Sequence, residues 1–133
     1  MSLDILRTTR GWLVSSSSLK PLVNSNNIKV GWSKLPDSFP CIIITQMGGT
    51  DTGYLGYKSS AAGSRLRKEY ATIQVDILDK INRLNTIIIG DIITPVLMVS
   101  SQCSKVGDIE TYDDTLSAYR KVQTYSMLSF HND

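Results

Sequence analysis

Hydrophobic and polar residues alternate most regularly in the segment KEYATIQVDILD, from Lys68 to Asp79. Alternation with a period of two places the apolar side chains on one face of a β-strand, so this segment is predicted to be a strand with one buried and one polar face. Two strands are predicted before it: IKVGW (Ile28–Trp32) and the β-branched run CIIITQM (Cys41–Met47). The second run is typical of a strand with a well-buried centre.

Two other segments have the period of a helix. LDILRTTRGWLV (Leu3–Val14) is predicted to be a short amphipathic helix because its three leucines fall on one stripe. NRLNTIIIGDIITPVLMVSS (Asn82–Ser101) carries apolar residues at i, i+4 positions, which favours a helix packed on a sheet. A helix is disfavoured by the many β-branched residues of this segment and by Gly90 and Pro95. We nevertheless predict a helix because of the apolar stripe.

The C-terminal part is predicted to form a β-hairpin, with arms at about Lys105–Tyr112 and Tyr119–Phe130 and the turn DDTLS between them. The predicted order is therefore α-β-β-β-α-β-β. Segregation of strands and helices indicates an α+β fold: a mostly antiparallel sheet of about five strands with two helices on one face. A chain of 133 residues fits one domain, residues 1–133.

Between the second and third predicted strands lies GGTDTGYLGYKSSAAGSRLRK (Gly48–Lys68), rich in glycine, serine and alanine and without apolar periodicity. Structureless segments of this length inside a domain are usually functional or disordered. We expect either a long hairpin arm with a paired base or a disordered loop. Apolar and aromatic residues on such an arm suit an interface with another chain, and the candidates are Tyr54, Leu55 and Tyr57.

Catalytic and metal-binding motifs are weak. Asp51-Thr52-Gly53 matches the Asp-Thr-Gly of aspartic proteases, but Tyr54 follows where that family has a small residue. The only histidine, His131, lies close to the C-terminus, and no pair of histidines or cysteines has metal-ligand spacing. We therefore expect no catalytic, cofactor or metal site, and a protein that is not an enzyme.

No apolar run reaches the length of a membrane span, and the N-terminus has no hydrophobic signal region. An intracellular setting without a membrane partner is therefore expected. The two cysteines, Cys41 and Cys103, form either a pair of reduced thiols or a single disulfide.

The succession of segments resembles a known family. An N-terminal helix and a serine-rich break are followed by a strand, the proline-bracketed stretch LPDSFPCIIITQMGG, a glycine-rich arm leading into RLRKEYATIQVDILD, a helix, and a hairpin ending YRKVQTYSMLSF. This pattern, from about Leu3 to Phe130, is similar to the tail-terminator or tail-completion proteins of long-tailed phages and related viruses. The resemblance implies a structural virion protein of the tail and neck that is assembled in the host cytoplasm.

In that family the protein forms a ring, usually hexameric, that caps the tail tube and docks to the head connector and neck proteins. Genomic DNA passes through the ring without specific recognition. The alternatives are another neck protein, such as a head-completion or connector-stopper protein, and a homodimeric aspartic protease using Asp51.

The charges fit an assembly of this kind. Residues 1–68 carry 9 Lys/Arg against 3 Asp/Glu, and residues 69–133 carry 5 against 9, so the halves have net charges of +6 and −4. The positive charges are mostly dispersed, which argues against a dedicated nucleic-acid-binding domain. A ring needs two different surfaces of each copy to meet, and opposite charges favour such a contact. The hypothesis pairs Arg65, Arg67 and Lys68 with Asp108, Glu110, Asp113 or Asp114 of an adjacent subunit.

Overall fold

The computed structural model of the chain describes residues 5–32, 36–55, 66–101 and 103–132. The elements follow in the order α1 (Ile5–Val14), a 3-10 turn (Ser25–Asn27), β1 (Ile28–Val30), β2 (Cys41–Leu55), β3 (Leu66–Asp79), α2 (Arg83–Ser101), β4 (Ser104–Asp113) and β5 (Ala118–Asn132). This confirms the predicted α+β class and the order α-β-β-β-α-β-β.

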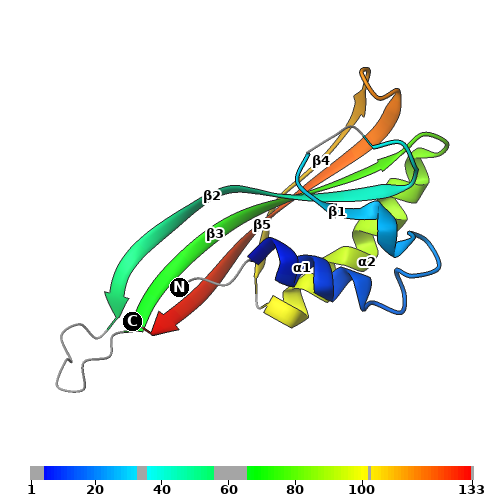
Figure 1. Cartoon of the computed structure of the whole chain (residues 1–133). Coiled ribbons are helices and arrows are strands. Elements are labelled where there is room, and N and C mark those ends of the chain that lie inside the picture. Colours follow the sequence, from blue (N-terminus) through cyan, green and yellow to red (C-terminus); the bar gives the residue numbers. More distant parts are fainter. Residues whose placement is uncertain (1–4, 33–35, 56–65, 102, 133) are drawn as a thin grey trace.

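The five strands form one mixed sheet in the order β1-β2-β3-β5-β4 (Figure 1). β1 runs parallel to β2, and the other neighbours are antiparallel. The central strand β3 pairs with β5 without interruption, from Leu66 opposite Asn132 to Asp79 opposite Tyr119. β3 and β5 therefore form the continuous spine of the sheet.

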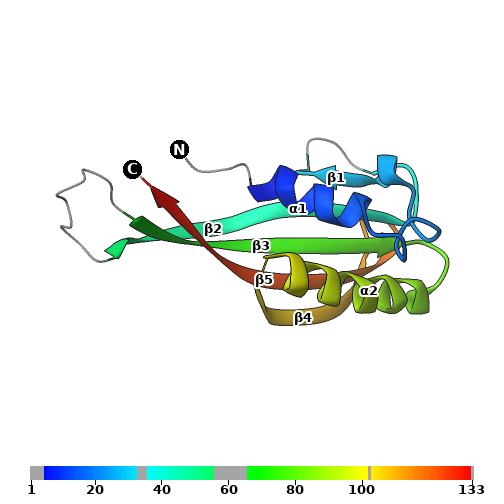
Figure 2. The same cartoon turned by 90° about the horizontal axis from the view of Figure 1, so that it is seen from below.

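Both helices cover the same face of the sheet, below it in Figure 1 and in front of it in Figure 2. The alternation in β3 explains this layer, because every second side chain from Ile73 to Ile77 is fully buried towards the helices. The core of this layer includes Leu13, Ile42, Ile44, Ile73, Val75, Ile77, Ile89, Ile93, Leu97 and Tyr125.

The other face of the sheet is also partly buried, where a wholly polar face was predicted for β3. Leu78 and Asp76 are both fully buried. A second apolar cluster covers this face near the start of β2, with Trp32 and Phe39 packed against it. It contains Cys41, Ile43, Leu78, Leu116 and Ala118.

The helix α2 includes both Gly90 and Pro95, two residues that are unfavourable inside a helix. A β-carbon on Gly90 would lie 2.8 Å from Nε2 of Gln123 and 2.9 Å from Cε of Lys121, so glycine lets the helix approach β5 closely. Pro95 leaves the carbonyl oxygen of Asp91 without its helical donor, but both residues are exposed, so water can replace that bond.

Of the two alternatives for Gly48–Lys68, the disordered loop is wrong for the described part of that segment. β2 continues to Leu55 and β3 begins at Leu66, and the ladder runs from Gly48 opposite Thr72 to Leu55 opposite Leu66. The register shifts between Gln46 and Gly48 and again between Asp51 and Tyr54. Each bulge breaks the alternation of side chains, which hid the strand in the sequence. The hairpin alternative is therefore confirmed up to Leu55, and residues 56–65 lie outside the described part of the chain.

Candidate assembly surface

A three-stranded arm extends the sheet beyond both helices (Figures 1 and 2). We define the arm as residues 50–55 of β2, 66–70 of β3 and 128–132 of β5, and call the rest of the described chain the body. Strands need a packed apolar face or a covering helix for stability of their own. The described helices do not extend over the arm, so contact with another chain could supply this packing.

Both outer strands of the arm have open edges. The pairing of β1 with β2 ends at Val30 opposite Ile44, and the pairing of β4 with β5 ends at Ser104 opposite Ser126. Along the described residues, no further strand lies beside either edge of the arm. Open edges expose backbone donors and acceptors that can pair with another chain.

The structure brings four of the predicted interface residues to the end of the arm. Tyr54 and Leu55 are the last residues of β2, and Arg67 and Lys68 are among the first of β3. Tyr54 lies opposite Arg67 in the ladder. Tyr57 and Arg65 fall outside the described residues.

The predicted acidic residues lie towards the other end of the sheet, which we call the body end: there β3 ends at Asp79 and β5 begins at Ala118. Asp113 ends β4 and Asp114 follows in the exposed turn. Asp108 and Glu110 come earlier in β4 and lie further from the body end. The acidic residues and the cations of the arm are therefore not brought together within one copy.

Three of these four acidic residues already have partners in their own chain. Asp108 accepts from Nζ of Lys105 at 2.9 Å and forms an ion pair with Nζ of Lys121 at 2.8 Å. Partial burial raises the pKa of Asp108, but the two lysines outweigh this effect and hold the pKa below its usual value. Glu110 pairs with Arg83.

Asp113, the third of these residues, pairs with Arg120 in a cluster around the buried Asp76, on the sheet face opposite the helices. The fully buried Asp76 carboxylate accepts from Nε and Nη2 of Arg120 at 3.2 and 3.1 Å and from Nε2 of Gln74 at 3.0 Å. Nη1 of Arg120 lies 3.5 Å from Asp113, and the guanidinium lies 5.5 Å from the centre of the Trp32 ring. This cluster ties three strands together, and the sequence did not indicate it.

A second buried polar group fixes α2 on the sheet. Nε2 of Gln123 donates to the carbonyl oxygen of Gly90 at 3.2 Å, and the Tyr125 hydroxyl donates to Oε1 of Gln123 at 2.8 Å. Thr94 Oγ1 lies 2.9 Å from the same hydroxyl. Burial raises the pKa of Tyr125 to about 12, so its hydroxyl is protonated at neutral pH and can donate.

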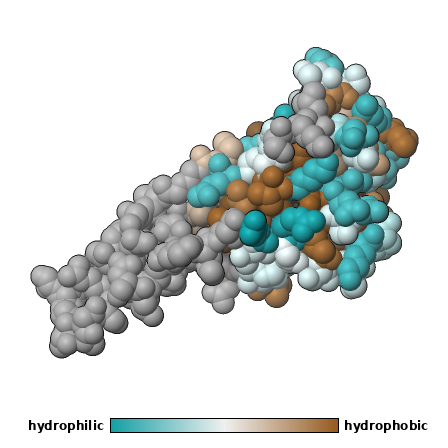
Figure 3. All heavy atoms as spheres, in the orientation of Figure 1, coloured by the Kyte–Doolittle hydropathy of each residue, from teal (hydrophilic) through white to brown (hydrophobic). Residues whose placement is uncertain are grey.

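The outer side of α2 is unusually apolar for an exposed helix surface. Large side chains on and next to this helix are exposed: Ile81, Leu84, Ile88, Met98 and Val99. Apolar residues reach the surface of the body among polar ones in Figure 3. By length and composition Arg83–Ser100 could also cross a membrane, but three of its residues are part of the protein core: Ile89, Ile93 and Leu97. Gathered apolar residues of this kind mark interaction sites.

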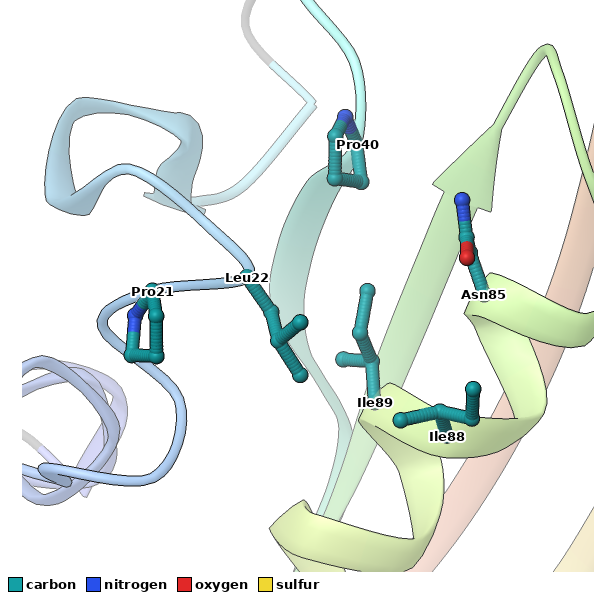
Figure 4. Close-up of a pocket in the computed structure, with 6 residues that line it drawn as sticks. All are labelled: Pro21, Leu22, Pro40, Asn85, Ile88 and Ile89. Atoms are coloured by element: carbon teal, nitrogen blue, oxygen red, sulfur yellow. The ribbon is translucent and has the colours of Figure 1, made fainter.

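A hollow of about 160 Å³ opens beside the first turns of α2 (Figure 4). Pro21 and Leu22 form one wall, Pro40 lies at the start of β2, and the helix supplies the other wall. The helical residues of the hollow are Asn85, Ile88 and Ile89. We call this hollow the α2 pocket. Its walls come from segments far apart in the sequence, so it could not be predicted from a local sequence motif.

The residues that were considered for chemistry lie in or beside the strands of the sheet. Asp51 lies opposite Glu69 in the β2–β3 ladder, so the Asp-Thr-Gly sequence is part of a strand. Cys41 and Cys103 are free thiols, and burial raises the pKa of Cys41 to about 12. Over the described residues, no group of three histidine, cysteine or acidic side chains could hold a metal ion.

Comparison with known proteins adds no family: no protein-family model matches this chain, and no curated protein matches it.

Proposed function

We propose that this chain is a structural protein of the virion neck, and that copies of it form a ring that caps the tail tube as in the tail-terminator proteins its sequence resembles. The observation that carries the proposal is the arm, a three-stranded extension of the sheet beyond both helices that the structure describes (Figure 1). An extension of this kind is stabilised when a second chain covers it or pairs with its edges.

The cations at the end of the arm favour contact with a different, acidic surface of a neighbouring copy, and Asp51 and Glu69 lie further from this end. Arg67 and Lys68 lie at the end of the arm, whereas Asp113 and Asp114 lie at the body end. A contact between two different surfaces repeats from copy to copy and produces a closed ring when the rotation closes. The proposed ring docks to the tail tube protein and the head connector, and genomic DNA passes through its centre.

Reversing one charge on the arm is expected to weaken the ring. Arg67→Glu replaces attraction to the acidic body end with repulsion, and should weaken each contact between copies by about 1–2 kcal/mol at low salt. The measurement is the mass in solution by light scattering across a dilution series. The loss should shrink in 1 M salt, where the Debye length falls to about 3 Å.

Arg7→Glu is the matched control, because it makes the same charge change at an exposed position of α1, on the body and away from the lining of the hollow beside α2. The ring of this control should dissociate like the wild type. Equal dissociation of the two variants would show that the charge at the end of the arm does not contribute to the contact between copies.

A further inference from the structure

We infer that the end of the arm of one copy binds the α2 pocket of the next copy. This inference rests on the proposed function, because it names the two surfaces through which the ring closes. It is drawn from the apolar character of the pocket, the residues that end the arm, and the distance between the two sites within one copy.

The pocket has the size and chemistry of a receptor for one large apolar side chain. Its volume of about 160 Å³ is close to the roughly 150 Å³ that holds a benzene ring in a protein cavity. Two of its apolar lining residues are also exposed to solvent, Leu22 by 40% and Ile88 by 48%, and Leu84, one turn before Ile88 in α2, is 55% exposed. An anchor side chain in a pocket with an apolar surround is the usual centre of a protein interface.

The end of the arm supplies residues of the matching kind. Tyr54 and Leu55 end β2, and tyrosine in particular is enriched among the residues that dominate binding energy. Arg67 lies opposite Tyr54 in the ladder. If Tyr54 is the anchor, Arg67 comes with it to the body end of the neighbouring copy. That end carries the acidic turn at Asp113 and Asp114, whose charge is opposite to that of Arg67.

The arm cannot reach the pocket of its own chain. β3 runs from Leu66 at the arm to Asp79 at the body end, 14 residues that span roughly 45 Å at the rise of an extended strand. The pocket lies at the body end, because Pro40 precedes β2 and Asn85 donates to Asp79 at 2.7 Å. An arm that binds this pocket therefore comes from a second copy, which places the arm of each subunit on the body of the next.

Mixing two variants that each carry one added cysteine tests this contact. Leu55→Cys and Ile88→Cys are prepared separately, mixed, allowed to assemble and treated with a mild oxidant. The native cysteines are buried, so they add little background. The expected product is a covalent dimer that forms several-fold more in the mixture than in either variant alone. Leu84→Cys, one turn before Ile88, provides a second position beside the pocket.

Val99→Cys is the matched control, because it is 81% exposed and lies near the other end of the same helix. A ring whose cross-linking is several-fold stronger at position 88 or 84 than at position 99 supports the inference. A ring that shows no cross-link at 88 or 84, or equal cross-links at all three, overturns the inference and leaves the proposed function standing. A monomeric mass at the highest soluble concentration overturns both.

Discussion

Replacing Arg120 with leucine is expected to lower the free energy of unfolding by about 3–5 kcal/mol. Asp76 is fully buried, and Arg120 donates two of the hydrogen bonds that its carboxylate accepts, at 3.1 and 3.2 Å. Without the guanidinium, the fold retains a buried carboxylate with Gln74 as its remaining side-chain donor in this cluster. Urea unfolding followed by circular dichroism measures the loss.

Arg83→Leu is the control for Arg120→Leu, because the side chains of its ion pair with Glu110 are 55% and 38% exposed. An exposed pair contributes at most about 1 kcal/mol, so this variant should unfold close to the wild type. Adding Asp76→Asn to Arg120→Leu removes the unpaired charge and should recover part of the stability. Equal losses of unfolding free energy in the two arginine variants would show that the Asp76 cluster stabilises the fold no more than an exposed ion pair does.

Gly90→Val is expected to destabilise the fold by about 3 kcal/mol through overpacking. The new β-carbon would lie 2.8 Å from Nε2 of Gln123 and 2.9 Å from Cε of Lys121. Neither side chain can move freely, since Gln123 is bonded to Tyr125 and Lys121 to Asp108. Thermal unfolding by calorimetry measures the change.

Gly11→Val provides the comparison on the other helix, because a β-carbon at Gly11 meets no atom within 4 Å. Valine has a slightly better helix propensity than glycine, so this variant should stay within about 0.5 kcal/mol of the wild type. Equal losses of stability in the two valine variants would show that the close approach of α2 to β5 does not explain the effect at Gly90.

The sequence predicted those elements whose side-chain period is unbroken. The strict alternation in β3 and the i, i+4 stripe of α2 each identify the buried face, because packing against the core requires that period. The stripe outweighed Gly90 and Pro95 for physical reasons visible in the fold. One sits at a close helix–strand contact, and the other lies on the exposed side of α2.

The second half of β2 escaped prediction because two bulges interrupt it. Gly48, Gly49 and Gly53 lie at or near the register shifts, where an extra residue moves the following side chains to the opposite face. Local composition therefore resembles a loop, although the backbone pairs with β3 up to Leu55.

The candidate site was predictable only on one side of the proposed contact. Composition pointed to the arm, and the structure places Tyr54, Leu55, Arg67 and Lys68 at its end. The α2 pocket depends on the tertiary approach of Pro21 and Leu22 to α2, and no local pattern records such an approach. The same holds for Asp76 and Arg120, which are 44 residues apart in the chain.

The mass of the purified protein in solution decides whether copies of this chain form a ring. The chain has a mass of 14.7 kDa, and we expect a discrete species of about six copies by light scattering, with a ring and a central opening in negative-stain images. A strict dimer, or a monomer at the highest soluble concentration, would contradict the proposal that the arm joins copies of this chain into a ring.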